Sequence, residues 1–95
     1  MNLLSDELIL FWKEIKMIQE YVVNVSLSKE SKYDDVRDLL NDVTYETICK
    51  IMELLDGYRN NNLKGVIIDN LSNKVINCNI ELHDFCEEFL NVSDI

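Results

Sequence analysis

The chain has 95 residues, 47% of them apolar, and carries 18 acidic against 9 basic side chains, for a net charge of −9. This length predicts a single domain over residues 1–95, and the apolar fraction is sufficient for folding. The charge argues against binding to nucleic acid or to an anionic membrane, because both need clusters of Lys and Arg. The longest apolar run, Leu8–Trp12, is too short to span a bilayer.

The N-terminal segment and the cysteines both favour a cytoplasmic protein. No basic side chain precedes Asp6 and Glu7, so the segment lacks the pattern of a secretory signal. Cys49, Cys78 and Cys86 are odd in number and lack CxxC spacing, which is typical of reduced thiols.

An amphipathic helix is predicted over about residues 5–25. Ser5 can cap it, and Asp6 and Glu7 suit the positive end of the helix dipole. Apolar side chains then recur at steps of three and four residues, at Leu8, Phe11, Trp12, Ile15, Ile18, Val22 and Val25. The serines between Ser26 and Ser31 predict a break.

Two further apolar stripes follow, from Tyr33 to Val43 and from Tyr45 to Leu55. The spacing is helical in both, but it does not distinguish two separate helices from one bent helix. Gly57 predicts the end of this helical region, because glycine readily adopts the left-handed conformation of a helix C-terminus.

A β-hairpin and a last helix are predicted in the C-terminal third. Val66–Ile68 is β-prone, Asn70–Asn73 is a turn, and an alternating segment follows. In that segment the apolar side chains are Ile76, Cys78 and Ile80, and the polar ones, expected to face water, are Asn77 and Asn79. Residues 81–90 return to helical spacing with four inward positions, Leu82, Phe85, Phe89 and Leu90.

The expected fold class is therefore α+β, with N-terminal helices packed on a β-hairpin that is followed by a C-terminal helix. A two-stranded hairpin is marginal alone in water. Either the helices cover it, or its free edge pairs with a second copy in a homodimer.

Two short segments account for the whole net negative charge, because acidic and basic side chains balance in the rest of the chain. Residues 34–46 contain five acids and one base, and residues 81–95 contain five acids and neither Lys nor Arg. Asp34, Asp38 and Asp42 are four apart, so a continuous helix would place them on one face, where they repel one another. We expect either a solvated face or a surface that attracts a basic partner by electrostatic steering.

Residues with metal-binding or catalytic chemistry are few. His83, Cys86 and Glu87 lie within one helical turn and could share a metal with Cys78, although a zinc site needs three or four ligands at defined distances. Cys86 could also act as a nucleophile beside His83, but nothing predicts an oxyanion hole. The simpler interpretation places Cys78 and Cys86 in the core and gives His83 a local hydrogen bond. We therefore predict no enzyme activity, no cofactor and no metal.

The C-terminal half contains the pattern LDGY, at Leu55–Tyr58, and the pattern ELHDF, at Glu81–Phe85. The pair resembles small acidic bacterial immunity proteins over roughly 40 residues. Such proteins neutralise a toxin by tight binding, so the resemblance implies occlusion of a partner and no catalytic residues.

These observations predict a cytoplasmic inhibitor that binds one basic protein, a toxin domain such as a nuclease. The residues expected to bind this partner are Asp34, Asp35, Asp38, Asp42, Glu81, Asp84, Glu87 and Glu88. The alternative is a homodimeric structural or regulatory module whose interface is the hairpin edge or the N-terminal helix with Trp12.

Overall fold

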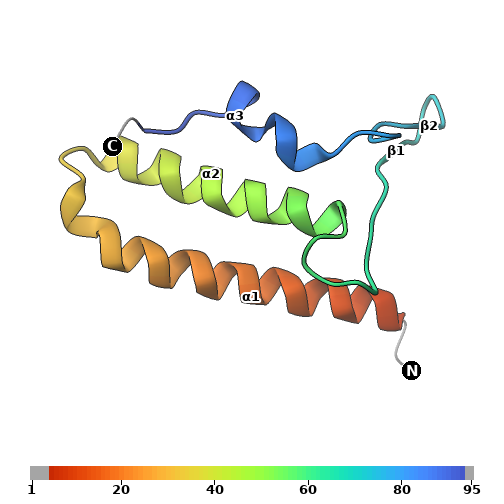
Figure 1. Cartoon of the computed structure of the whole chain (residues 1–95), viewed down its shortest axis with the longest axis horizontal. Coiled ribbons are helices and arrows are strands. Elements are labelled where there is room, and N and C mark those ends of the chain that lie inside the picture. The colour runs from red at the N-terminus through yellow and green to blue at the C-terminus, as the bar shows by residue number, and fades with distance from the viewer. Residues whose placement is uncertain (1–4, 94–95) are drawn as a thin grey trace.

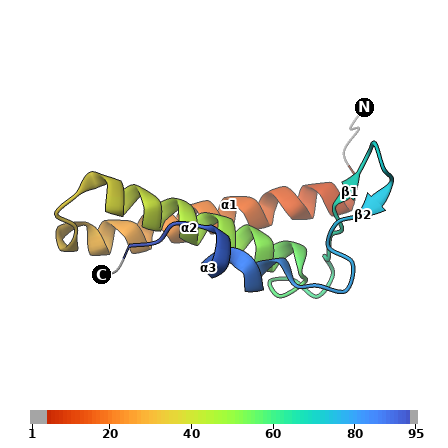
Figure 2. The same ribbon diagram turned by 90° about the horizontal axis from the view of Figure 1, so that it is seen from above.

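A computed structural model of the chain describes residues 5–93 as three layers lying side by side (Figure 1). Helix α1 (Asp6–Lys29) and helix α2 (Val36–Leu55) are antiparallel neighbours. The C-terminal segment then returns along the other side of α2, as Figure 2 also shows from above. The molecule is elongated, with extents of 45 × 33 × 23 Å.

Helix α1 begins where the sequence predicts and ends four residues later than expected. The Ser5 hydroxyl caps it by accepting a hydrogen bond from the Leu8 amide at 3.1 Å. The predicted break between Ser26 and Ser31 is confirmed, because α1 ends at Lys29, although Ser26 and Ser28 themselves are still helical. The Ser28 hydroxyl donates to the Val25 carbonyl at 2.7 Å, so it makes its hydrogen bond within the helix. A short 3-10 turn, η1 (Glu30–Lys32), follows.

Helix α2 is one continuous helix, which settles the alternative that the sequence left open. The Asp35 carboxylate caps its start by accepting from the Arg37 amide at 2.8 Å. The Thr44 hydroxyl donates to the Leu40 carbonyl one turn back and so causes no break. The prediction for Gly57 is confirmed: it has φ +88° directly after the helix, where its amide donates to the Leu54 carbonyl.

The apolar core lies between α1 and α2 and is small. Within residues 5–93, its fully buried members are Ile18 and Val22 of α1 and Leu54 of α2. The half-buried side chains that pack around them are Phe11, Ile15, Val43, Ile51 and Leu63.

The β-hairpin is present but shorter than expected. Strands β1 (Ile68–Asp69) and β2 (Lys74–Val75) are antiparallel, with Ile68 opposite Val75. The predicted turn is confirmed, because Asn73 has φ +60° and the Asp69 carboxylate accepts from the Ser72 hydroxyl at 2.8 Å.

The predicted strand over residues 76–80 is wrong. Asn77, expected to face water, is buried, whereas Ile76, Cys78 and Ile80 are exposed. The reason is that the Asn77 amide replaces backbone pairing: its Oδ1 accepts from the Ile67 amide at 2.8 Å, and its Nδ2 donates to the Gly65 carbonyl at 3.2 Å. This side chain joins the two ends of the hairpin.

The predicted C-terminal helix is only partly formed. A 3-10 turn, η2 (Leu82–Phe85), leads into one turn of α-helix, α3 (Cys86–Phe89). Phe85 and Phe89, expected to face inward, are exposed. A 3-10 turn has three residues per turn and an α-helix 3.6, so the change between them shifts the buried face. Cys86 is the one that becomes buried.

The fold is thus mostly helical with a small two-stranded sheet, and only loosely α+β. The expected packing of the N-terminal helices on the hairpin is wrong. The helices pack on each other, and α2 packs on the C-terminal segment, while the hairpin lies beyond the end of α2 (Figure 1).

Candidate protein-binding surface

Asp56 attaches the C-terminal segment to the end of α2. Its side chain is only 2% exposed. Oδ1 accepts from the Leu82 amide at 2.9 Å, Oδ2 accepts from the His83 amide at 2.9 Å, and Oδ2 also lies 2.6 Å from His83 Nδ1. A buried carboxylate with three such partners fixes both the position and the orientation of the segment that begins at Glu81.

The pKa values of Asp56 and His83 move apart, which favours an ion pair. The hydrogen bond to Asp56 raises the pKa of His83, with Asp84 and Glu81 acting in the same direction against a smaller effect of burial. Burial acts to raise the pKa of Asp56, but its hydrogen bonds from His83 and Leu82 together outweigh burial and lower it. The pair therefore holds its charges over a wide range of pH.

Tyr58 contacts both His83 and Glu81 beside the Asp56–His83 pair. Its hydroxyl donates to the Glu81 carboxylate at 2.6 Å, and its ring meets the His83 ring edge to face at 4.9 Å between centroids. The Glu81 hydrogen bond raises the pKa of Tyr58. Tyr58 belongs to the LDGY pattern and Glu81 to the ELHDF pattern, so the two patterns meet in space.

Asp42 attaches the far end of the same segment. Its carboxylate accepts from the Ser93 amide at 2.6 Å, from the Ser93 hydroxyl at 2.7 Å and from the Tyr33 hydroxyl at 2.7 Å. Burial acts to raise its pKa, yet the hydrogen bonds from Ser93 and Tyr33 together lower it. The carboxylate that the sequence places in a partner-binding row is thus engaged in holding the fold.

The predicted row of Asp34, Asp38 and Asp42 on one helix face is wrong, because α2 begins at Val36 and Asp34 precedes it. The two acidic segments nevertheless adjoin, since residues 81–93 run along α2 between the two anchors, Asp56 and Asp42. We define the acidic surface as the predicted partner-binding residues other than Asp42. Its half-buried member is Asp38, and its exposed members are Asp34, Asp35, Glu81, Asp84, Glu87 and Glu88.

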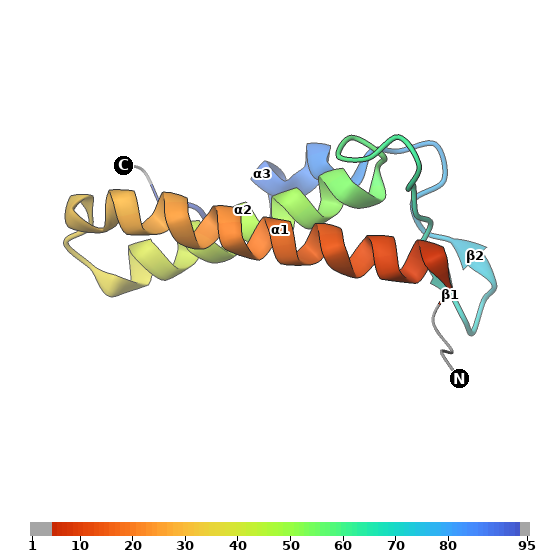
Figure 3. The same ribbon diagram turned by 90° about the horizontal axis from the view of Figure 1, so that it is seen from below.

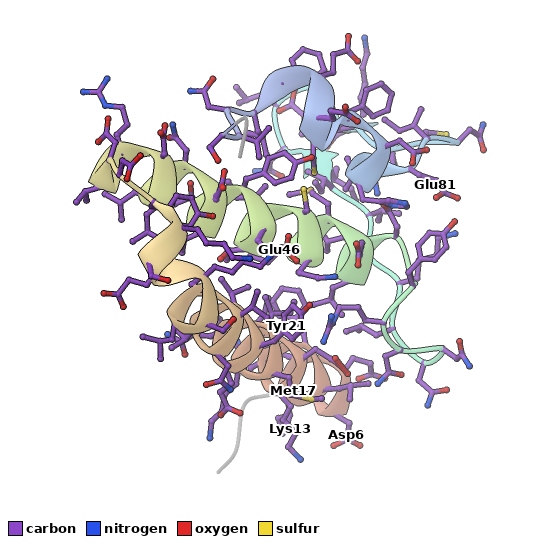
Figure 4. The ribbon with its side chains drawn as sticks, turned by 60° about the vertical axis from the view of Figure 1, so that its left-hand side comes forward. Asp6, Lys13, Met17, Tyr21, Glu46 and Glu81 are labelled. Atoms are coloured by element: carbon purple, nitrogen blue, oxygen red, sulfur yellow. The ribbon has the colours of Figure 1, made fainter. Side chains whose placement is uncertain are left out.

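The face of α1 and α2 that Figure 4 presents carries both charged and apolar side chains. Lys13, Met17 and Tyr21 project from α1, and Glu46 projects from α2 (Figure 4). Lys50 lies 3.7 Å from Glu46 and 5.4 Å from the centre of the Tyr21 ring, so it links the two helices there.

The metal grouping considered from the sequence does not assemble within residues 5–93. Cys78 is exposed near the hairpin, whereas Cys86 is buried against Cys49. Burial, followed by the hydrogen bond to Cys86, raises the pKa of the Cys49 thiol to about 12. The prediction that Cys86 packs in the interior is confirmed, and the same prediction for Cys78 is wrong.

A different group has the spacing of cation ligands. One atom each of Asp56, Glu81 and His83 can be chosen so that all three lie within 4.8 Å of one another. In this structure, however, Asp56 accepts hydrogen bonds from His83, and Glu81 accepts one from Tyr58. The arrangement therefore serves directly as a hydrogen-bonded anchor. The hydrogen bond expected for His83 was a local one, whereas the partner found, Asp56, is 27 residues away in the sequence.

No protein-family model matches this chain, and no curated protein or solved structure gives a significant match to it. The resemblance to immunity proteins stays a prediction. None of the helices within residues 5–93 has the length and apolar character needed to cross a membrane.

Proposed function

We propose that this protein is a cytoplasmic, non-catalytic inhibitor of the immunity type, which binds a basic toxin domain through its acidic surface. The observation that carries the proposal is the adjacency of the two acidic segments. Distant in sequence, they are joined by the hydrogen bonds from Ser93 to Asp42, while Asp56 holds the start of the second segment at the other end of α2. Together the two segments account for the whole net charge of −9.

Such a surface suits a partner with a positive cleft, as in a nuclease domain. Clustered charge speeds the encounter of complementary proteins and aligns them before close contact forms. The two anchors hold residues 81–93 against α2 before the partner arrives, so less conformational entropy is lost on binding. Inhibition then follows from covering the cleft, which needs no reactive side chain.

The first test is to identify the partner from the DNA flanking the gene. We expect an adjacent reading frame with an export signal and a basic C-terminal module. That module, purified, should bind this protein with an association rate that falls about tenfold between low and high salt, because ions screen the attraction. A neighbourhood without such a gene, or no binding by its product, would contradict the proposal.

A matched pair of triple variants tests the surface itself. Asp84→Asn, Glu87→Gln and Glu88→Gln together remove three negative charges from the acidic surface. Asp6→Asn, Glu7→Gln and Glu20→Gln remove three from exposed positions of α1. The first set should slow association about tenfold and the second by less than about twofold. Equal effects would show that net charge, rather than this surface, governs binding.

A further inference from the structure

An apolar groove runs along α1 and α2 on the face away from Tyr21. Trp12 and Tyr21 are nine residues apart, which is two and a half helical turns, so they lie on opposite sides of α1. The groove consists of a hollow of about 560 Å³ and a second of about 200 Å³, which share Val23 and Val43. Its main apolar lining is Trp12, Val23, Leu27, Leu39, Leu40 and Val43.

No other helix lies in front of α1 when the molecule is viewed from below (Figure 3). Large side chains are consequently left in water. Leu27 is 64% exposed, Trp12 58% and Leu40 56%. A contiguous patch of this kind on a small protein marks an interaction site.

The accessible surface of the chain is larger than that of a compact monomer of the same mass. The chain exposes 7465 Å². A compact monomer of its mass would expose about 5,700 Å² by the usual scaling with molecular weight. The excess is about 1,800 Å², part of which belongs to the exposed hairpin, where Leu71 is 95% exposed. It is larger than the about 800 Å² that a stable protein interface takes from each partner, so the chain has enough surface for such an interface. The radius of gyration, 15.6 Å, likewise exceeds the roughly 12 Å expected of a compact domain of this length.

The charges show which occupant fits. Among residues 5–93, Lys16 and Glu30 are the only charged residues that line the two hollows, so this face has little to attract a basic protein. The members of the acidic surface from Glu81 to Glu88 lie on the C-terminal layer, which is on the other side of α2 from α1 (Figure 1). Two copies can therefore bring their grooves together while their negative layers point outward, away from each other.

We infer that the groove is covered by the groove of a second copy, related by a two-fold axis. Each copy contributes α1 and α2, so the contact forms a four-helix bundle whose shared core completes the small core of each chain. This interface uses the N-terminal helix together with α2. It does not depend on the proposed function, and it leaves both acidic surfaces free.

The mass of the purified wild-type chain in solution is the first test. Sedimentation equilibrium should give twice the chain mass of 11.2 kDa at micromolar concentrations and above. A mass of 11.2 kDa up to millimolar concentration would overturn the inference and leave the groove to a different partner.

Charge variants test the location of the interface. Leu40→Glu places a charge in the groove and should raise the dimer dissociation constant about 100-fold, because the side chain loses its water in the dimer. Leu71→Glu is the matched control, since Leu71 is 95% exposed at the hairpin turn. Circular dichroism should show equal helix content in both variants. Dimers that survive Leu40→Glu, or dissociate equally with Leu71→Glu, would contradict the groove as the interface.

Fluorescence of the wild-type chain gives a further test of the interface, because its single tryptophan, Trp12, lines the groove. Its emission should shift to longer wavelength on dilution, over the same concentrations at which the mass halves. Added salt should tighten the dimer by screening the repulsion between two chains of charge −9, whereas it should weaken binding to a basic partner. An emission spectrum unchanged while the mass halves would place the interface elsewhere.

Discussion

Helix α2 is held on its two sides by different kinds of interaction. On the α1 side, Ile18, Val22 and Leu54 exclude water, and the contact is apolar and non-directional. On the C-terminal side, Asp56 and Asp42 hold the chain by hydrogen bonds at its two ends, with Cys86 buried between them. The apolar contact supplies most of the stability, whereas the polar contacts fix the position of the acidic surface.

The largest effect should come from the apolar side. Leu54→Ala removes a side chain that is fully buried, so it should lower the free energy of unfolding by about 3 kcal/mol through lost burial and the cavity that remains. Urea unfolding followed by circular dichroism measures this change. Leu71→Ala, at an exposed position, should cost less than about 0.5 kcal/mol. A similar cost at both positions would show that α1 and α2 do not share the core described.

The polar side should respond locally. Asp56→Ala leaves the partly buried amides of Leu82 and His83 without their acceptor, which should cost about 2 kcal/mol. Amide hydrogen exchange should therefore accelerate in residues 82–90 while the middle of α1 keeps its protection. Asp42→Ala should accelerate exchange only near Ser93, because it releases the other end. Equal loss of protection in α1 would mean that the two sides of α2 are not separable.

The smallest effect is a dependence on pH. The pKa of His83 is raised above 6.5 in the folded state, so its contribution to stability is complete below pH 6.5 and is lost as pH rises through the folded value. The pKa of Asp56 is lowered below 3.8, so its contribution is complete above pH 3.8 and is lost as pH falls through the folded value. Both contributions are complete between pH 3.8 and pH 6.5, so the free energy of unfolding should be greatest in that range.

His83→Gln isolates the alkaline part of this dependence. The variant should lose about 1 kcal/mol at pH 5.5 and should no longer lose stability between neutral and mildly alkaline pH. The loss of stability at acid pH should remain in this variant, because Asp56 and Asp42 both have lowered pKa values. Unfolding midpoints in urea, measured for both proteins across this range, make the comparison. Parallel curves above pH 6.5 would contradict a charged His83.

The sequence predicted the elements whose signals are local. The Ser5 cap, the Gly57 helix end and the turn at Asn70–Asn73 depend on neighbouring residues, and all three are confirmed. The continuous α2 could not be distinguished from two helices. Thr44 is a residue type that can cap a new helix, but its hydroxyl can equally donate to the Leu40 carbonyl within one helix, as it does here.

The anchors could not be predicted, because they join distant parts of the chain. Asp56 is 27 residues from His83, and Asp42 is 51 residues from Ser93. One signal was available: an aspartate at a helix C-terminus opposes the helix dipole, so its presence indicates a compensating donor. The burial of Asn77 had no such signal, since its alternation with Ile76 and Cys78 is typical of a strand.

The cysteines give the folded chain unequal chemical accessibility. Cys86 is buried in the C-terminal layer, where a reagent does not reach it. Burial raises the pKa of the neighbouring Cys49 thiol to about 12, so Cys49 offers little thiolate to a reagent in neutral solution. Cys78 faces solvent near the hairpin. A maleimide dye or spin label added to the native protein would therefore attach first at this one position. It lies outside the groove, and it lines the same hollow as Glu81 at one end of the acidic surface. Cys78 therefore allows the wild-type protein to be labelled at one position for distance measurements between copies or to a bound partner.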